Sequence, residues 1–118
     1  MINQVTLVGR LTKDPELRYT TEGKMFLPVI LAVQRPYRGQ EGGGKADFVL
    51  CTFWNKMAEN TAKYCSKGSL IGVLGSIQTR NYENKEGKKV HITEVVAKSV
   101  QFLSSKPQEE TFPLMELE

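Results

Sequence analysis

Apolar and polar residues alternate along most of the chain, which is the pattern of half-buried β-strands. Glycine, proline, asparagine and aspartate cluster between the alternating stretches and indicate turns. The predicted strands cover residues 2–11, 24–34, 46–54, 69–80 and 90–103. Pro28 lies inside the second strand and indicates an edge or a bulge there, because proline has no N–H to donate. The pattern therefore predicts a mostly β protein.

One segment follows a helical period instead. Residues 56–65 place Ala58, Ala62 and Cys65 on one helical face. Asn55 is suited to cap the start of this helix, and Gly68 to terminate it. Five strands with one short helix between the third and fourth suit a five-stranded Greek-key barrel of the OB type, an all-β fold. A split antiparallel sheet with one helix is the alternative, and periodicity does not choose between the two.

Length and composition exclude several classes of protein. The chain has 118 residues, which favours one domain, and 40% of them are hydrophobic. The longest apolar runs are too short for a membrane span, and the N-terminus lacks the features of a signal peptide, so we expect a cytoplasmic protein without membrane association. Cys51 and Cys65 lie fourteen residues apart without a CxxC motif. This spacing argues against a disulfide framework and a zinc site.

The chain has a formal net charge of +3, and its charged residues are distributed unevenly along the sequence. Residues 1–105 hold 15 of the 16 Lys and Arg and 9 of the 13 Asp and Glu, a net charge of +6. Residues 106–118 carry a net charge of −3, from Lys106 and four glutamates. We therefore expect a basic domain over residues 1–104, an acidic disordered tail over 105–118, and a polyanionic partner.

The strand at 46–54 carries the most specific signal. Val49, Cys51 and Phe53 form a compact apolar face, which we assign to the core. Phe48 and Trp54 then stand on the outer face, where exposed rings can stack on the bases of single-stranded nucleic acid. A core position for Trp54 is equally compatible with the alternation, and the strand alone does not decide.

Two loops combine an aromatic residue with cations. The glycine-rich loop holds Tyr37 with Arg35, Arg38 and Lys45, and the last hairpin holds Tyr82 with Arg80 and Lys85. Solvated lysines and tyrosines that cover the ends of a barrel would give the same pattern, but its presence in both loops favours binding. The chain contains no nucleophile elbow, phosphate-binding glycine loop or paired metal ligands, so we expect neither enzymatic activity nor a cofactor.

Three separated segments resemble bacterial single-stranded DNA-binding proteins. They read NQVTLVGRLTKDPELRY, ENTAKYCSKGSLIGVLGSIQTRNYEN and TEVVAKSVQFL, and they occur in the family's order and spacing. The resemblance covers residues 2–104 and implies an OB barrel that assembles as a homotetramer and binds single-stranded DNA. It also implies roles in replication, recombination, repair or DNA uptake, in the cytoplasm at the nucleoid. An RNA-binding or primosome-type OB module is the alternative within the same fold.

The resemblance also implies particular binding residues. The family's stacking positions match Tyr37, Phe48, Trp54 and Tyr82, and its phosphate contacts match Lys56, Lys67 and Arg80. Better-studied members often have tryptophan at the first, second and fourth stacking positions and phenylalanine at the third, so every position stays aromatic. Charge and placement add Arg10, Arg35, Arg38, Lys45 and Lys85 as candidate phosphate contacts.

The C-terminal segment departs from the family pattern. Typical members carry a Gly/Gln/Pro-rich linker and an acidic tip that ends in Pro-Phe and recruits replication and repair enzymes. Here the linker is absent, and Phe112-Pro113 stand in reversed order inside the segment. We therefore expect no recruitment of such enzymes through this tail.

Overall fold

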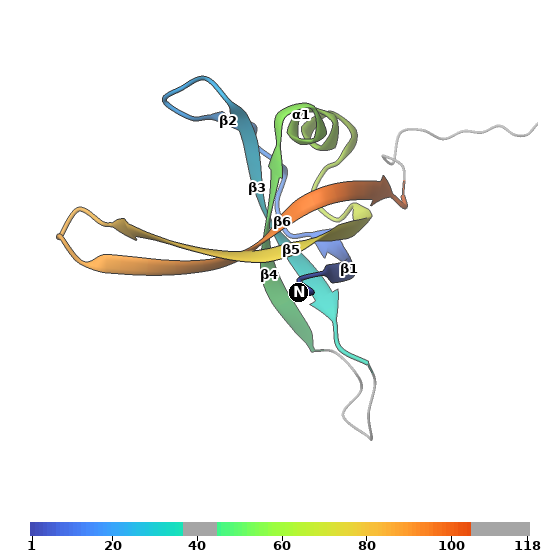
Figure 1. Ribbon diagram of the computed structural model, residues 1–118. Coiled ribbons are helices and arrows are strands. Elements are labelled where there is room, and N and C mark those ends of the chain that lie inside the picture. The colour runs from blue at the N-terminus through green and yellow to red at the C-terminus, as the bar shows by residue number, and fades with distance from the viewer. Residues whose placement is uncertain (37–44, 105–118) are drawn as a thin grey trace, which may run out of the picture.

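The structure is a computed structural model that describes residues 1–36 and 45–104, so the predictions for Tyr37, Arg38 and the acidic tail lie outside the described residues. Its strands are β1 (Val5–Leu11), β2 (Arg18–Tyr19), β3 (Met25–Gln34), β4 (Ala46–Trp54), β5 (Leu70–Glu83) and β6 (Lys89–Phe102). Helix α1 (Asn55–Tyr64) lies between β4 and β5 (Figure 1). All five predicted strands and the predicted helix are therefore present.

The strands bond in a ring. Their order is β1-β5-β6-β4-β3-β2, and a further pairing joins β1 to β3 at Arg10↔Ala32 and Leu11↔Leu31. All pairs are antiparallel except β4 and β6, which run parallel over two residues. The sequence did not predict β2, because a strand of two residues has no measurable alternation. With β2 counted, the helix follows the fourth strand instead of the third.

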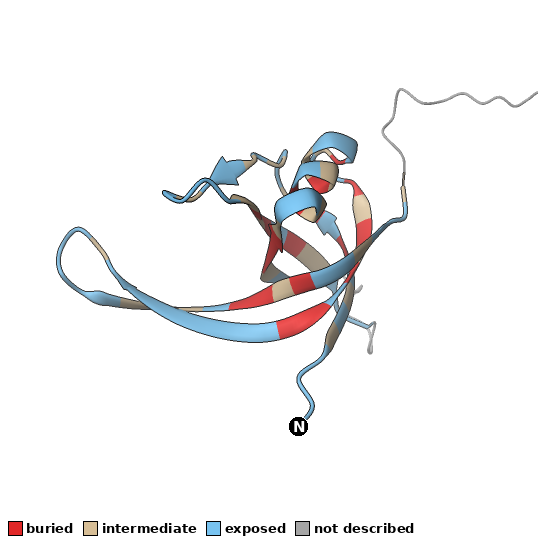
Figure 2. Cartoon of the chain, turned by 45° about the horizontal axis from the view of Figure 1, so that its top comes forward, coloured by how far each residue is buried: buried red, intermediate tan, exposed pale blue. Residues whose placement is uncertain are grey.

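The core lies inside the ring and beneath α1. Figure 2 shows the buried segments gathered where the strands cross below the helix. From β4, Cys51 and Phe53 are fully buried, and the half-buried Val49 packs against the core, as the alternation predicts. The helix adds Ala58, and its predicted apolar face is confirmed by the half-buried Ala62. Burial of these side chains supplies the main driving force for the fold.

Two predictions about the ends of the helix are wrong. Asn55 is its first residue, the cap position belongs to Trp54, and no side chain caps the helix. Asn55 has φ 58°, a left-handed value that asparagine tolerates better than most residues. The helix ends at Tyr64, where the N–H of Cys65 bonds the Thr61 carbonyl at 3.1 Å. Gly68 instead serves a later turn, with φ 90°.

One proline and two glycines influence how the ring of strands is paired. Pro28 lies on β3 between the segments that pair with β1 and β2, and its pairing with β4 continues without a shift, so the position is a local edge and not a bulge. A Cβ on Gly9 would lie 2.5 Å from the Ala32 carbonyl oxygen, where β1 closes on β3. A Cβ on Gly75 would lie 2.2 Å from the Val96 carbonyl oxygen, at the register shift between β5 and β6.

Beyond this shift, β5 and β6 leave the body of the molecule as a long two-stranded hairpin, which we call the arm (residues 77–95). The arm reaches well past the ring and ends in the turn at residues 84–88 (Figure 1). Residues 77–83 of β5 are all exposed. Apart from Glu94 and Val95, which are buried where the arm joins the body, the side chains of the arm are therefore exposed or half-buried (Figure 2).

Candidate nucleic-acid interface

The outer face of β4 carries aromatic rings. Because side chains alternate along a strand, Phe48 and Trp54 point away from the core that holds Cys51 and Phe53. Phe48 is 68% exposed. Trp54 is half-buried and stacks on Phe26 of β3, with ring centroids 5.4 Å apart and an interplanar angle of 30°. Trp54 is therefore outside the core cluster, and one of its faces is already occupied by a ring of the protein.

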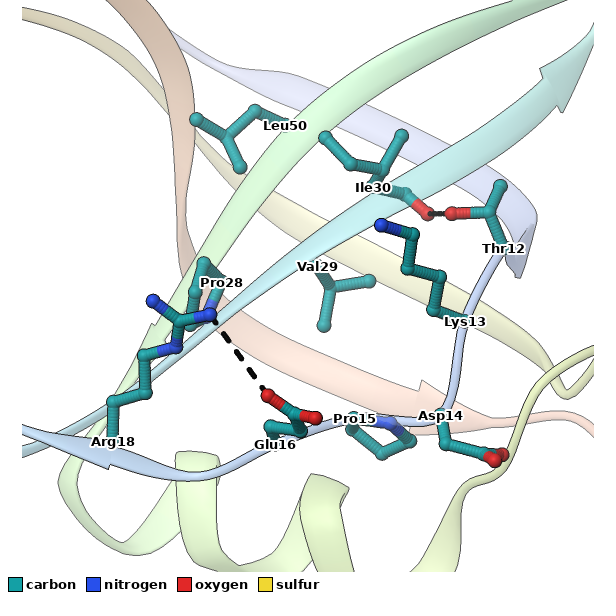
Figure 3. Close-up of a pocket in the computed structure, with 10 residues that line it drawn as sticks. All are labelled: Thr12, Lys13, Asp14, Pro15, Glu16, Arg18, Pro28, Val29, Ile30 and Leu50. Carbon is teal, nitrogen blue, oxygen red and sulfur yellow. Dashed lines mark hydrogen bonds and ion pairs between the residues drawn. The ribbon is translucent and has the colours of Figure 1, made fainter.

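A groove lies on the same face, between the segment that follows β1 and the strands β3 and β4. It has a volume of about 440 Å³ and an apolar floor that includes Pro28, Ile30 and Leu50 (Figure 3). Lys13 and Arg18 stand at its rim, and Arg18 lies 3.9 Å from Glu16 in an exposed ion pair. An apolar floor with cations at the edge suits a nucleobase flanked by phosphates.

The register of β3 and β4 connects the rings to the groove. Phe26 pairs with Trp54, Ile30 with Leu50, and Ala32 with Phe48. Trp54 and Phe48 are six positions apart, which corresponds to roughly 20 Å along an extended strand. The apolar floor therefore lies between the two rings, and the three features form one continuous strip, which we call the outer strip (Phe26, Ile30, Phe48, Leu50 and Trp54).

The arm adds an aromatic residue and a cation. Arg80 and Tyr82 are two residues apart on β5 and therefore share a face. Tyr82 is 47% exposed. The guanidinium of Arg80 donates from Nε to Oε2 of Glu94 at 2.9 Å, and the hydroxyl of Thr52 donates to Oε1 of the same carboxylate at 2.6 Å. Thr52 belongs to β4, so these hydrogen bonds connect the arm to the outer strip.

Arg35 is held differently from Arg80. Its Nε and Nη2 both donate to the carboxylate of Asp47, with an Nη2–Oδ1 distance of 2.8 Å. These hydrogen bonds and the charge of Asp47 raise the pKa of Arg35 above its ordinary value. The hydrogen bonds from Arg35 lower the pKa of Asp47 below its ordinary value. Asp47 therefore stays ionised and neutralises much of the charge that Arg35 could offer a phosphate.

The remaining predicted cations lie around the outer strip at different places. Arg10 pairs in register with Ala32, beside Phe48, and its Nη1 donates to the Gly68 carbonyl at 2.9 Å. Lys56 lies in the first turn of α1, directly after Trp54 of the outer strip, and its Nζ is 3.4 Å from Oε1 of Glu59. The other predicted cations are Lys45 before β4, Lys67 after α1 and Lys85 in the turn of the arm, and all of them are exposed. Lys85 lies at the far end of the arm from the body, so these cations do not form a single cluster.

Sequence reasoning missed several side chains of this face, namely Lys13, Arg18, Phe26 and Glu94. The alternation of β3 contains a signal for Phe26, because it puts Phe26, Pro28 and Ile30 opposite the buried Leu27 and Val29. No local pattern points to Lys13 or Glu94, since their places depend on strands that are distant in the sequence.

Both cysteines lie in the interior of the part of the chain that the structure describes. Cys51 and Cys65 are free and buried, and burial raises the pKa of the Cys51 thiol to about 11. This thiol therefore stays protonated and unreactive at neutral pH. No group of three or more His, Cys, Asp or Glu within residues 1–36 and 45–104 could hold a metal ion. Within those ranges α1 is far too short and polar to span a bilayer.

Comparison with known protein families gives one match. A family model described as the single-strand binding protein family matches residues 2–103. The chain therefore belongs to the single-strand binding protein family, whose members are non-enzymatic DNA-binding proteins.

The similar proteins differ in length. Single-stranded DNA-binding protein B of Bacillus subtilis strain 168 is 59% identical over 109 residues, which cover 92% of this chain and 96% of that protein. Single-stranded DNA-binding protein 3 of Listeria innocua is 58% identical over 90% of this chain and 66% of its own length. Single-stranded DNA-binding protein A of B. subtilis is 56% identical over 90% of this chain and 62% of its own length. The chain thus spans about two thirds or less of most relatives and nearly all of one.

Proposed function

We propose that this protein binds single-stranded DNA without sequence preference by laying it along the outer strip and the arm. The observation that carries the proposal is the placement of Phe48, Trp54 and Tyr82 outside the core with cations beside them. Bases stack on such rings for about 1–3 kcal/mol each whatever their identity, and cations neutralise the phosphates. Duplex DNA keeps its bases stacked inside the helix, where these rings cannot reach them.

We further propose that the ring of five long strands is an OB-type Greek-key barrel over residues 1–104. The order of the strands, the single helix after β4 and membership of the family support this assignment. In an OB fold the loops and strands on one face bind the nucleic acid, and the outer strip occupies such a face. The protein would coat single strands that form during replication, recombination, repair or DNA uptake, at the nucleoid.

Titration with an oligonucleotide tests the binding face. Trp54 is the only tryptophan, so its fluorescence reports on one site. We expect oligo(dT) to quench this emission strongly at saturation, because a base stacks on the free face of the ring. Duplex DNA of equal length is the control and should leave the emission nearly unchanged. Unchanged emission with saturating oligo(dT) would remove Trp54 from the interface, and tighter binding of an RNA oligomer would favour an RNA-binding module.

A second surface supports assembly into a homotetramer. Val8, Leu74 and Leu103 form an exposed apolar patch over β1, β5 and the end of β6, around a hollow of about 280 Å³. β1 pairs with β5 from Val5 to Arg10 but with β3 only at its last two residues. Within the described chain, the rest of that edge has no strand partner. Open edges and apolar patches are features that proteins cover by association.

Light scattering tests this assembly. At micromolar concentration we expect a mass of about four times 13.3 kDa. Leu74→Glu should lower the mass, because a carboxylate in the apolar patch loses its water when the subunits associate. Tyr19→Glu is the matched control, since Tyr19 is exposed on β2 outside the patch. A wild-type monomer, or equal masses for both variants, would contradict the proposal.

A further inference from the structure

An acidic residue is buried beneath the surface that we propose to bind single-stranded DNA, which is itself a polyanion. Glu94 of β6 is 7% exposed, and it is the only charged side chain that is buried among the residues the structure describes. Its neighbours Val95 and Ala97 belong to the core, but alternation turns Glu94 to the opposite, outer side. A carboxylate here repels phosphates and loses most of its hydration, so its presence needs a physical reason.

The reason lies in the partners of the carboxylate. Thr52 of β4 donates to Oε1 at 2.6 Å, and Arg80 of β5 donates from Nε to Oε2 at 2.9 Å. Each oxygen thus receives one hydrogen bond, and three strands meet at one side chain. The Arg80 side chain is 54% exposed, whereas the Glu94 side chain beneath it is 7% exposed. The carboxylate of the ion pair is therefore held in place by the protein, whereas the guanidinium is accessible to solvent.

This geometry leaves most of the guanidinium available. Arginine has five N–H donors, and the pair with Glu94 uses the one on Nε. No other hydrogen bond or ion pair of Arg80 is recorded within residues 1–36 and 45–104. The four N–H groups on Nη1 and Nη2 can therefore bind a phosphate, which arginine does through two parallel hydrogen bonds. A side chain that is already ordered also loses less conformational freedom when DNA arrives.

We propose that Glu94 is a positioning residue, which together with Thr52 holds Arg80 ready to bind a phosphate of single-stranded DNA beside Tyr82. This inference rests on the proposed function and names the contact between the arm and the DNA backbone. The carboxylate itself does not touch the DNA. Its charge is offset by Arg80, and its effect on binding comes from the orientation of the guanidinium.

Arg35 and Asp47 offer a contrast within the same molecule. Asp47 accepts from both Nε and Nη2 of Arg35, so one whole edge of that guanidinium is occupied. Asp47 is itself exposed, so it does not anchor the pair from below. We therefore assign the phosphate contact to Arg80 and not to Arg35.

The alternative is that Glu94 only stabilises the junction of β4, β5 and β6. The direction in which the DNA affinity changes when the charge of Glu94 is removed distinguishes this alternative from a positioning role. Glu94→Gln keeps the size of the side chain and raises the formal net charge of +3 by one unit. Bulk electrostatics then predict tighter binding of DNA. A glutamine has one acceptor oxygen in place of two, and in either orientation of its amide the ion pair with the guanidinium of Arg80 is lost. Positioning therefore predicts weaker binding despite the gain in positive charge.

The experiment measures the affinity for oligo(dT) by titration at several salt concentrations. We expect Glu94→Gln to bind about three- to tenfold more weakly than the wild type, and Arg80→Ala at least as weakly as Glu94→Gln. Both variants should lower the slope of log affinity against log salt by about 0.7, the value for one phosphate on a single strand. In the Arg80→Ala background, Glu94→Gln should cause no further loss.

Glu22→Gln is the matched control, because it removes the same charge from an exposed turn outside the outer strip and the arm, where Glu22 takes part in no ion pair of the described chain. Its affinity should equal that of the wild type or rise slightly. Should Glu94→Gln fail to fold, Thr52→Val removes the second anchor without changing any charge, and it should also weaken binding. Thr52→Ser keeps the hydroxyl and should restore the affinity.

Two different failures are distinguishable. If Arg80→Ala leaves both the affinity and the salt slope unchanged, the arm does not contact the phosphates and the proposed binding face is wrong at that point. If Arg80→Ala weakens binding but Glu94→Gln binds as tightly as the wild type or more tightly, the positioning role is overturned. The same holds if Thr52→Val and Thr52→Ser bind equally well.

Discussion

Phe53→Ala should lower the free energy of unfolding by about 3–5 kcal/mol, the usual loss when a fully buried aromatic ring is truncated to a methyl group. Phe53 is 0% exposed and belongs to the core cluster inside the ring. Its removal leaves a cavity that the surrounding strands cannot close, because β4 is paired with both β3 and β6. Since domains are commonly stable by about 5–15 kcal/mol, this one change removes a large fraction of the total.

Urea unfolding at a fixed protein concentration measures this loss, with Trp54 fluorescence as the probe. Phe48→Ala is the matched control on the same strand, because Phe48 is exposed and should change stability by no more than about 0.5 kcal/mol. Phe53→Leu, which leaves a smaller cavity, should lie between the two. Equal stability of the two alanine variants would contradict the assignment of the two faces of β4.

The double variant Phe48→Ala/Tyr82→Ala should lose most of the affinity for oligo(dT) and keep the fold. Each ring is expected to contribute about 1–3 kcal/mol through stacking on a base. Phe48 lies on β4 and Tyr82 on the arm, so the two share no partner and their losses should add. Both side chains are exposed, which is why their truncation should leave the unfolding curve nearly unchanged.

Titrations of the wild type, the two single variants and the double variant at one salt concentration test this expectation. Tyr64→Ala is the matched control, since Tyr64 is an exposed tyrosine on α1 that contacts Phe102 and lies outside the outer strip and the arm. Its DNA affinity should equal that of the wild type. Wild-type affinity in the double variant would show that these rings do not stack on bases.

The secondary structure was largely predictable because it depends on local periodicity. The strand at residues 46–54 was predicted with the bounds that β4 has, and the compact set Val49, Cys51 and Phe53 correctly indicated which face is turned to the core. Side chains two residues apart share a face whatever the rest of the chain does, so this information is present in any short segment. The family resemblance rested on longer segments, and the match over residues 2–103 confirms it.

The errors at the ends of the helix show where local chemistry is not sufficient for prediction. Asn55 and Gly68 have the right chemistry for a cap and a terminator, but the chain enters the helix directly from β4 and leaves it at Tyr64. Ile77 shows the same limit on a strand. It shares a register with the buried Ile71 and Val73, yet it is exposed, because β5 has left the body of the molecule by that point.

By itself the sequence determined the five long strands, the helix, the core face of β4 and the membership of the family. The tertiary structure alone decided which side chains meet. Trp54 stacks on Phe26 because β3 and β4 are in register, and Arg80 meets Glu94 and Thr52 where three strands converge. Thr52 and Glu94 are 42 residues apart in the chain. Contacts over such separations depend on the order of the strands, because the alternation within one strand determines which face is buried but not which strand lies beside it.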